Sequence, residues 1–262
     1  MRSLSRGALA ALAGALLLPA YAMAASSCDG QIGTSRVLEV NPVGLQVGTQ
    51  HFPQTLNLQD GEVVLTFDDG PHPGTTEQVL KALAHACVRA TFFVVGAHAA
   101  EHPALLKRII AEGHTVGHHS LTHPMTLADI TYDKAVVEIE RGFTSDDKAA
   151  YGVAGAHPRV PFFRFPGFGS SPELLEYLSK RGVGVFGADL WAGDWNPMTP
   201  EEQLTLTMHR LDHAKRGIIL FHDTRLQTAR MMAMFLAALK EKGYRVVHIV
   251  PAAAAVTASV PE

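Results

Sequence analysis

Short apolar runs alternate with helical patterns over most of this chain, and this alternation restricts its fold more than any other feature. The apolar runs have the length of buried strands, and the segments between them carry apolar residues at helical spacing. Strands and helices that alternate in this way form a parallel sheet with helices packed outside it. The expected strands are residues 63–67, 90–95, 114–116, 162–164, 183–186, 218–221 and 245–249.

Residues typical of helix ends occur between the expected strands. Pro103 stands where one helix begins, and Gly113 lies beyond its end. Residues 199–202, Thr-Pro-Glu-Glu, form a capping box with proline in the first helical position. Further helices are expected over residues 76–86, after Ser171-Pro172, and over residues 227–242, where Gly243 follows the end.

The length and composition of the chain fit one α/β domain. Its 262 residues are 47% apolar, which is enough for one well-buried domain, and the strands span fewer residues than the ~250 typical of an eight-stranded barrel. We therefore expect a single domain of about seven strands, with either a smaller, irregular barrel or a doubly wound open sheet. The expected domain covers residues 61–251, after an irregular arm at 25–60 and before a tail at 252–262, and segments 129–161 and 190–199 are its expected groove loops.

Five polar clusters follow expected strands on the carboxyl side. They are Asp68-Asp69, His119 with His123, Arg164, Asp189 with Asp194, and His222-Asp223. Parallel α/β proteins bind ligands beyond the carboxyl ends of their strands, so these clusters are expected to meet at one site. Each cluster by itself also has an ordinary explanation, since Asp-Asp-Gly-Pro is typical of a turn and a lone His-x3-His pair is a weak signal.

The first two clusters together supply the ligands of a metal site. One carboxylate and two imidazoles bind a divalent ion and leave a position open for water or substrate. The second carboxylate of the Asp68-Asp69 pair is then free to move a proton. Arg164 lies between aromatic residues at a strand end, where its charge needs an anionic partner. A metal-dependent hydrolase needs these groups.

The five clusters resemble, in order, the motifs of the polysaccharide deacetylases of carbohydrate esterase family four. Residues 66–70, Thr-Phe-Asp-Asp-Gly, match the first motif, and His119-Ser120-x-x-His123 matches the second. Arg164-Phe165-Pro166 resembles the third, Asp194-Trp195 with Asp189 upstream the fourth, and Leu220-Phe221-His222-Asp223 the fifth. The first two motifs together are highly specific. The family includes chitin, chitooligosaccharide, peptidoglycan and acetylxylan deacetylases.

The resemblance implies a role for each matched residue. It implies a distorted, incomplete (β/α) barrel of about seven parallel strands. In this barrel Asp69, His119 and His123 hold a divalent ion, zinc or else cobalt, nickel or manganese. Asp68 is implied as the general base and His222 as the general acid. The remaining implied site residues are Arg164 to hold Asp68, Asp189 or Asp194 to orient His222, the backbone N–H of Gly167 to bind the oxyanion, and Leu220 and Trp195 to contact the substrate.

Three departures from the family pattern concern the surroundings of the expected site. An additional glycine, Gly167, precedes the aromatic Phe168, where an aromatic residue usually follows the proline directly. The two aspartates of the fourth motif are five residues apart instead of three, which leaves open which of them orients His222. His118 stands where asparagine is common, and three histidines within six residues allow it a contact behind the metal ligands.

These residues predict a metal-dependent hydrolase that removes acetyl groups, N-acetyl before O-acetyl, from a carbohydrate polymer or oligosaccharide. A metal-dependent amidase acting on a non-sugar amide and a carbohydrate-binding relative without turnover are the alternatives. The filled metal, base and acid positions favour an enzyme over a binding protein. The net charge of −3 and the lack of a basic run argue against a nucleic-acid partner, and no obligate protein partner is evident.

The first 24 residues have the form of a secretory signal peptide. A start with two arginines precedes the apolar stretch 7–18, and Ala22-Met23-Ala24 supplies small residues for cleavage before Ala25. The apolar stretch is too short for a membrane span, so we expect an exported protein, periplasmic or secreted, with no span in its mature form. In an oxidising compartment Cys28 and Cys87 either form a disulfide or remain separate thiols, and the sequence leaves this open.

Overall fold

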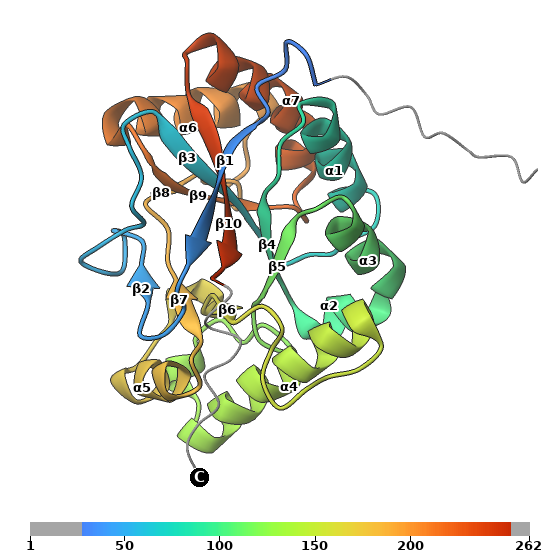
Figure 1. Cartoon of the computed structure of the whole chain (residues 1–262), viewed down its shortest axis with the longest axis vertical. Helices are drawn as coiled ribbons and strands as arrows, with labels where there is room; N and C mark the ends of the chain where they lie inside the picture. The colour runs from blue at the N-terminus through green and yellow to red at the C-terminus, as the bar shows by residue number, and fades with distance from the viewer. Residues whose placement is uncertain (1–27, 253–262) are drawn as a thin grey trace, which may run out of the picture.

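All seven expected strands are present in the computed structural model, which describes residues 28–252 (Figure 1). They are β3 (Glu62–Asp68), β4 (Thr91–Val94), β5 (Thr115–His118), β6 (Phe162–Phe163), β7 (Gly184–Phe186), β9 (Gly217–His222) and β10 (Arg245–Pro251). Three further strands lie where none is expected: β1 (Thr34–Val40), β2 (Gln46–Val47) and β8 (Leu190–Trp191). The α-helices are α1 (Thr76–His85), α2 (Gly96–Glu101), α3 (Pro103–Ala111), α4 (Tyr132–Tyr151), α5 (Pro172–Lys180), α6 (Pro200–Ala214) and α7 (Leu226–Glu241), and short 3-10 helices are η1 (Leu127–Asp129) and η2 (Pro166–Phe168).

The strands form a parallel sheet that curls into a partial barrel. The strand order is β1-β10-β3-β4-β5-β6-β7-β2, and β9 lies between β3 and β8. Every ladder is parallel. β7 and β8 follow one another along the chain, but no ladder within residues 28–252 joins them, so the ring of strands is incomplete there. The predicted fold class, a distorted and incomplete parallel barrel in a single domain, is confirmed.

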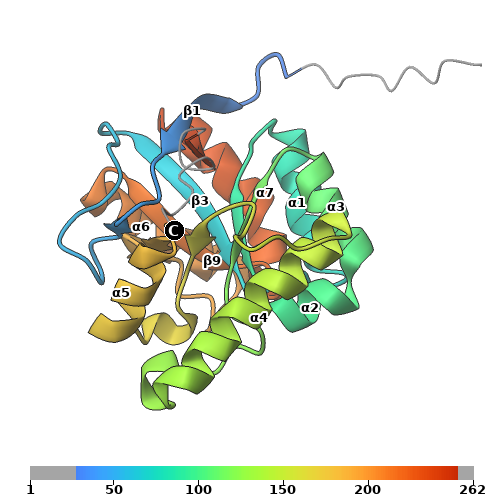
Figure 2. The same cartoon turned by 60° about the horizontal axis from the view of Figure 1, so that its bottom comes forward.

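Side chains on the strands alternate between two apolar layers, as the period of a strand requires. Val63, Leu65 and Phe67 of β3 belong to the outer layer, which packs against α1, α3, α6 and α7. Val64 belongs to the inner layer with Phe93 of β4, and this layer fills the barrel. Figure 2 shows the helices around the outside of the strands. Because both layers are apolar, the polar side chains of a functional site are expected at the ends of the strands. Within residues 28–252, no helix combines the length and the apolar character that a membrane span requires.

The segment expected to be an irregular arm carries strands β1 and β2, so that expectation is wrong for these residues. β1 pairs with β10 near the other end of the chain, and β2 pairs with β7. Arg36 of β1 donates hydrogen bonds of 2.9 and 2.7 Å to Glu62 at the start of β3, which lowers the pKa of Glu62 to about 2. β1 is an edge strand in which only Val40 is fully buried. Its sequence therefore lacks the apolar run of a central strand.

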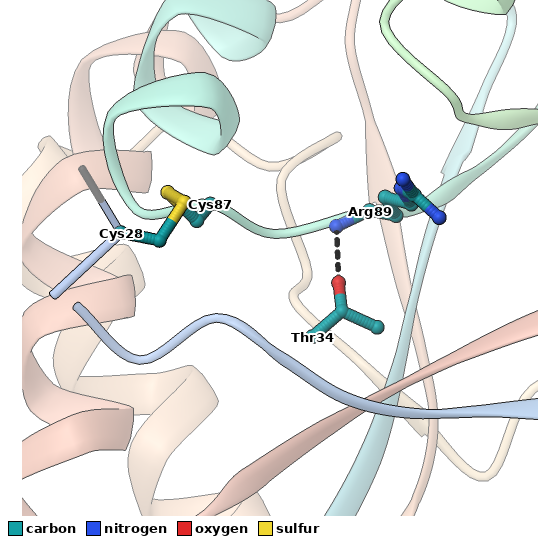
Figure 3. Close-up of a disulfide and its surroundings, with 4 residues drawn as sticks. All are labelled: Cys28, Thr34, Cys87 and Arg89. Carbon is teal, nitrogen blue, oxygen red and sulfur yellow. Dashed lines mark hydrogen bonds between the residues drawn. A yellow bond between two sulfur atoms is a disulfide. The ribbon is translucent and has the colours of Figure 1, made fainter. Parts of the chain in front are cut away.

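A disulfide joins Cys28 to Cys87 and ties the N-terminal segment to the loop between α1 and β4 (Figure 3). The Cα atoms of the two cysteines are 5.8 Å apart. Beside the bridge, Thr34 Oγ1 accepts a hydrogen bond from Arg89 N at 2.8 Å, and Thr34 N donates to Cys87 O at 3.0 Å. Of the two states that the sequence leaves open, the structure has the bridged one. A covalent link across a loop of this size stabilises a fold by roughly 4 kcal/mol.

The segment 129–161, expected to be a groove loop, contains the 20-residue helix α4. Buried apolar residues recur every four positions along it, at Ala135, Ile139 and Phe143. Asp146 and Asp147 continue this buried face, and their charge hides the helical pattern in the sequence. A Cβ atom on Gly142 would lie 2.7 Å from the carbonyl carbon of Ser120. Glycine therefore allows α4 to approach the loop after β5.

Candidate active site

The carboxyl ends of β3, β5, β6 and β9 bring their polar residues together at one cavity of about 300 Å³. β3 and β9 lie side by side, so that Asp68 and His222 are register partners. β5 pairs with β6 at the residues just before His119 and Arg164. The cavity is lined by Asp68, Asp69, His119, His123, Met125, Phe165, Gly167, Phe168, Trp191, Trp195, Leu220, His222 and Arg225.

Asp69, His119 and His123 bring three ligand atoms to within 4.8 Å of one another. Asp69 Oδ1 lies 3.2 Å from His123 Nε2 and 3.6 Å from His119 Nε2. These separations are close to the ~3.4 Å edge of a tetrahedron with bonds of about 2.1 Å, the usual Zn–N distance. Asp69 Oδ1 is buried without a hydrogen-bond partner among the described residues. A carboxylate oxygen that lacks a donor beside two imidazole nitrogens fits a bound cation.

A hydrogen bond holds the ring of His119 in the form that a metal needs. Its Nδ1–H donates to Arg164 O at 2.7 Å, because a carbonyl oxygen can only accept, and the lone pair of Nε2 is left for a ligand role. Burial lowers the pKa of His119 to about 3, so the ring is neutral. Asp69 and His123 have φ angles of 77° and 58°. Such left-handed conformations are uncommon outside glycine and concentrate at functional sites.

Arg164 holds Asp68 beside the three ligand residues. The guanidinium is completely buried, and its Nη1 donates to Asp68 Oδ1 at 2.7 Å and to Thr66 Oγ1 at 2.8 Å. Its other nitrogens donate to main-chain carbonyl oxygens of residues 186–187. Asp68 Oδ2 lies 3.8 Å from His119 Nε2. Burial raises the pKa of Asp68, and the positive charge of Arg164 opposes this shift.

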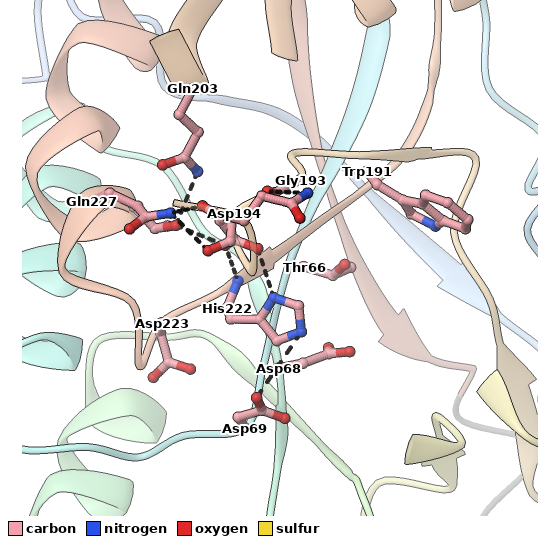
Figure 4. A network of polar contacts seen from close by, with 12 residues as sticks. Thr66, Asp68, Asp69, Trp191, Gly193, Asp194, Gln203, His222, Asp223 and Gln227 are labelled. Atoms are coloured by element: carbon pink, nitrogen blue, oxygen red, sulfur yellow. Dashed lines mark hydrogen bonds and ion pairs between the residues drawn. The ribbon is translucent and has the colours of Figure 1, made fainter. Parts of the chain in front are cut away.

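Asp194 orients the imidazole of His222 (Figure 4). The Nδ1–H of His222 donates to Asp194 Oδ1 at 2.7 Å, and the backbone N–H of His222 donates to Asp194 Oδ2 at 2.7 Å. Nε2 is then directed to the side of Asp69, whose Oδ2 is 4.0 Å away. Burial by itself lowers the pKa of His222, but the hydrogen bond to Asp194 and the charges of Asp194, Asp69 and Asp68 raise it to about 9. The surrounding carboxylates therefore favour the protonated ring.

The other aspartate of the expected fourth motif, Asp189, lies outside this cavity. Its Oδ1 accepts hydrogen bonds from the backbone N–H and the hydroxyl of Thr49, and its Oδ2 accepts from Thr55 Oγ1 and Ile218 N. Ile218 stands near the amino end of β9, opposite the end that carries His222. Asp189 thus joins the N-terminal segment to β9. Asp194, and not Asp189, contacts His222, and a catalytic role of Asp189 stays a prediction.

Asp223 shapes the loop that carries Asp69, a role that the sequence does not reveal. Its buried carboxylate accepts hydrogen bonds from Gly70 N at 3.1 Å and from Thr76 Oγ1 at 2.5 Å. A Cβ atom on Gly70 would lie 2.1 Å from Asp223 Oδ2, so only glycine allows this contact. Burial raises the pKa of Asp223 to about 7. On the other side of the loop, His98 Nδ1–H donates to Asp69 O at 2.7 Å. These partners are far apart in the chain and leave no local signal.

His118 faces α4 and not the three ligand residues, because successive side chains of a strand point in opposite directions. Its Nδ1 lies 2.7 Å from Asp146 Oδ2, and its ring meets Phe143 edge-on at 4.8 Å between centroids. Burial lowers the pKa of His118 to about 4 and raises that of Asp146 well above its ordinary value. His118 therefore links β5 to α4 behind His119.

Aromatic rings form one wall of the cavity. Phe168 stacks on His51 with 3.9 Å between ring centroids and an interplanar angle of 17°, and it lies 6.5 Å from Trp191. Trp191 meets Trp195 edge-on at 5.7 Å, and Trp195 meets His222 edge-on at 6.0 Å. Of these aromatic residues, the sequence singled out Phe168, Trp195 and His222. Trp191 of the cavity wall and His51, which packs behind Phe168, had no motif to mark them.

Gly167 and Leu220 complete the expected set of residues around the cavity. Gly167 has a φ of 54°, and a Cβ atom on it would lie 2.2 Å from Met125 O. The additional glycine therefore lets the chain pass close to the loop after β5. Phe168 still reaches the wall of the cavity, so the departure from the family pattern changes the path of the chain and keeps an aromatic ring there.

The fold and this cavity define a hydrolase of the parallel α/β class, and comparisons with known proteins identify the family. A family model described as polysaccharide deacetylase matches residues 56–186. A chitooligosaccharide deacetylase from Rhizobium leguminosarum bv. trifolii is 54% identical over 167 residues, which are 63% of this chain and 72% of the relative. A second one, from Sinorhizobium fredii, is 55% identical over 197 residues, 70% of this chain and 87% of the relative.

A solved structure of a deacetylase also resembles this chain. The peptidoglycan deacetylase of Bdellovibrio bacteriovorus aligns with a TM-score of 0.73 at 31% identity and covers 83% of this chain, while this chain spans 59% of that protein. The chain belongs to the polysaccharide deacetylase family. It is a hydrolase that acts on carbon–nitrogen bonds. The match to the family model ends before Asp194 and His222, so these two residues rest on the structure.

Proposed function

We propose that this chain is a metal-dependent deacetylase that removes N-acetyl groups from a glycan. The two rhizobial relatives are chitooligosaccharide deacetylases, and the Bdellovibrio neighbour is a peptidoglycan deacetylase. One observation carries the proposal: the Asp69, His119 and His123 ligand atoms, Asp68 and His222 line the same cavity. A cavity with these groups has what is needed to activate water and to protonate a leaving amine.

Asp69, His119 and His123 are the residues proposed to hold the divalent ion. Two imidazoles and one carboxylate are a catalytic zinc set with an open position, and cobalt, nickel or manganese could bind the same atoms. When bound, the ion polarises the acetyl carbonyl and lowers the pKa of its water toward ~7. The unpartnered Asp69 Oδ1 and the neutral His119 ring support this assignment.

Asp68 is the proposed general base. Arg164 occupies its Oδ1, so Oδ2 is the atom left to accept a proton from the attacking water. Burial raises the pKa of Asp68, which makes the carboxylate a stronger base, while the charge of Arg164 favours the ionised form that a base must have. The buried guanidinium therefore both positions this carboxylate and keeps it ready.

His222 is the proposed general acid. An amine leaves poorly as an anion, so the nitrogen of the cleaved amide must receive a proton as the bond breaks. Asp194 holds Nδ1–H, which leaves the Nε2–H of the protonated ring to donate into the cavity. The negative charge of Asp194 favours the protonated ring before the transfer and keeps the imidazole in one orientation throughout.

Gly167, Leu220 and Trp195 are proposed to contact the acetylated sugar. Gly167 lacks a Cβ atom and lines the cavity, so its backbone N–H is the proposed donor to the oxyanion. One such donor typically contributes ~10²–10³ in rate. Trp195 is 43% exposed, as a ring that receives a sugar should be, and Leu220 is buried beside it in the cavity wall.

Acetate release from chitooligosaccharides, peptidoglycan and acetylxylan tests the proposal. We expect metal-loaded protein to release acetate from at least one N-acetylated glycan. Turnover of a non-sugar amide with no release from any glycan would replace the proposal by the amidase alternative. Glycan binding without release from any of them would instead support a binding protein that has lost turnover.

We further propose that the protein is exported to the periplasm or secreted, with residues 1–24 removed as a signal peptide. These residues lie outside the part of the chain that the structure describes. The support is their pattern of charged, apolar and small residues, together with the Cys28–Cys87 disulfide, which suits an oxidising compartment. The mass of the protein recovered from the cell envelope or medium should correspond to a chain that begins near Ala25. A chain that still carries Met1 would contradict export.

A further inference from the structure

A second cavity, of about 660 Å³, lies between β8, α6 and the segment before β3, and the proposed chemistry makes no use of it. α6 contributes His209, Arg210 and His213 to its wall, and the N-terminal segment contributes Gln50. β8 contributes Trp191, which also lines the active-site cavity. The two cavities therefore have one tryptophan in common.

The N-terminal segment also runs from one cavity to the other. His51 stacks on Phe168 of the active-site wall at 3.9 Å and lies 6.0 Å from Trp191, measured between ring centroids. The preceding residue, Gln50, lines the second cavity and donates to Asp189 O at 3.0 Å. Trp191 lines both cavities, and His51, next to Gln50 in the chain, packs on the active-site wall. A glycan that extended from one cavity to the other would pass these two rings, and the faces of aromatic rings are surfaces on which sugars pack.

The second cavity offers hydrogen-bond donors and positive charge. Arg210 Nη1 donates to Trp191 O at 2.7 Å, and with no other partner for Arg210 among the described residues, its guanidinium keeps donors for a ligand. His209 and His213 lie one turn apart on α6, with 4.5 Å between their ring centroids. The carboxylate in the wall, that of Asp189, already accepts four hydrogen bonds. It is therefore satisfied and does not compete for the guanidinium.

We propose that this second cavity binds an anionic group of the glycan, a carboxylate on a sugar or on a peptide attached to it, while another sugar of the same chain occupies the active site. The proposal rests on the proposed deacetylase function and adds a substrate class to it, an acidic glycan in place of a neutral chitooligosaccharide. Arginine binds carboxylates through two parallel N–H donors, and the two imidazoles on the same face of α6 add donors beside it.

Binding of defined oligosaccharides to protein that also carries Asp68→Asn tests this without turnover. Three probes of equal glycan length are needed: a peptidoglycan oligosaccharide with its peptides, the same glycan without peptides, and a neutral chitooligosaccharide. Arg210→Gln is expected to weaken binding of an acidic probe roughly tenfold, the loss of one charge-assisted contact, and to change binding of the neutral probe less than twofold. The double variant His209→Gln/His213→Gln leaves the contact of Arg210 with Trp191 intact. It is also expected to weaken binding of an acidic probe more than binding of the neutral probe.

Lys215→Gln is the matched control, because it removes one positive charge just beyond the end of α6 at a different cavity, which includes Asp212 and Lys242. Equal weakening by this control, or equal loss of the neutral and acidic probes in Arg210→Gln, would overturn the proposal. A loss confined to the probe with peptides assigns the carboxylate to the peptide, and a loss for both acidic probes assigns it to the sugar. Arg210-dependent binding by protein with Asp68 intact that releases no acetate would overturn the proposed function and leave the anion site standing.

Discussion

Replacement of Asp68 by asparagine is expected to lower kcat by ~10²–10⁴, the usual contribution of a positioned general base, and to leave the metal content unchanged. The amide has the shape of the carboxylate and its oxygen can still accept the hydrogen bond of Arg164, which is 2.7 Å long in the structure. What it loses is the oxygen that accepts a proton. Acetate release at saturating substrate and elemental analysis of the same sample measure the two quantities together.

Asp69→Asn, at the neighbouring position, is the matched control. It changes a ligand and not the base, so it should weaken metal binding and recover part of its activity at high zinc. If Asp68→Asn loses the metal while Asp69→Asn retains it, the two roles are exchanged and the assignment is wrong.

His222→Ala extends the same comparison to the acid. It should keep the metal, as Asp68→Asn does. It should reduce the hydrolysis of an amide more than that of an activated acetate ester, because the leaving group of such an ester needs no proton.

Removal of the divalent ion by a chelator is expected to abolish turnover, and addition of zinc or cobalt to restore it. The purified protein should contain about one ion per chain, held by Asp69, His119 and His123. His123→Ala should lose the ion, because two remaining ligands rarely retain it. Elemental analysis before and after chelation, with acetate release measured on each sample, checks the expectation.

His85→Ala is the control for loss of a histidine. His85 ends α1 at the opposite end of the sheet and belongs to a different cavity, so this variant should keep both metal and activity. Full activity in protein that elemental analysis shows to be free of metal would contradict the metal-dependent mechanism.

Most of the strands and their common polar end could be predicted from the sequence. Asp68, Arg164 and His222 each follow directly on buried apolar residues of a strand, and His119 follows directly on the buried strand β5. The link between a strand and the turn after it is covalent. Because parallel strands direct their carboxyl ends to one edge, four short motifs were enough to locate the cavity. The catalytic roles of these residues remain predictions.

Other features depend on partners that are distant in the chain. β1 is a half-exposed edge strand that exists through its pairing with β10. The buried face of α4 includes two aspartates, so hydrophobic periodicity missed the longest helix of residues 28–252. The Cys28–Cys87 bridge needs a close approach of two segments that no local pattern records. The pairing of a strand and the burial of a helix face are tertiary properties. A sequence pattern indicates them only where the buried residues of the element are themselves apolar.

The two aspartates of the fourth motif show most clearly what the sequence determined and what only the tertiary structure decided. Both Asp189 and Asp194 follow β7, and the sequence alone offered no choice between them. The two-residue strand β8 lies between them and pairs with β9 at Ile219 and Leu220. It carries the chain from the amino end of β9 to the carboxyl end. At the amino end Asp189 accepts a hydrogen bond from Ile218 N, and at the carboxyl end Asp194 accepts one from His222 Nδ1. The sequence determined which residue types reach this part of the sheet. The length and pairing of one short strand, set by contacts with a segment about thirty residues later, decided which aspartate contacts the proposed acid.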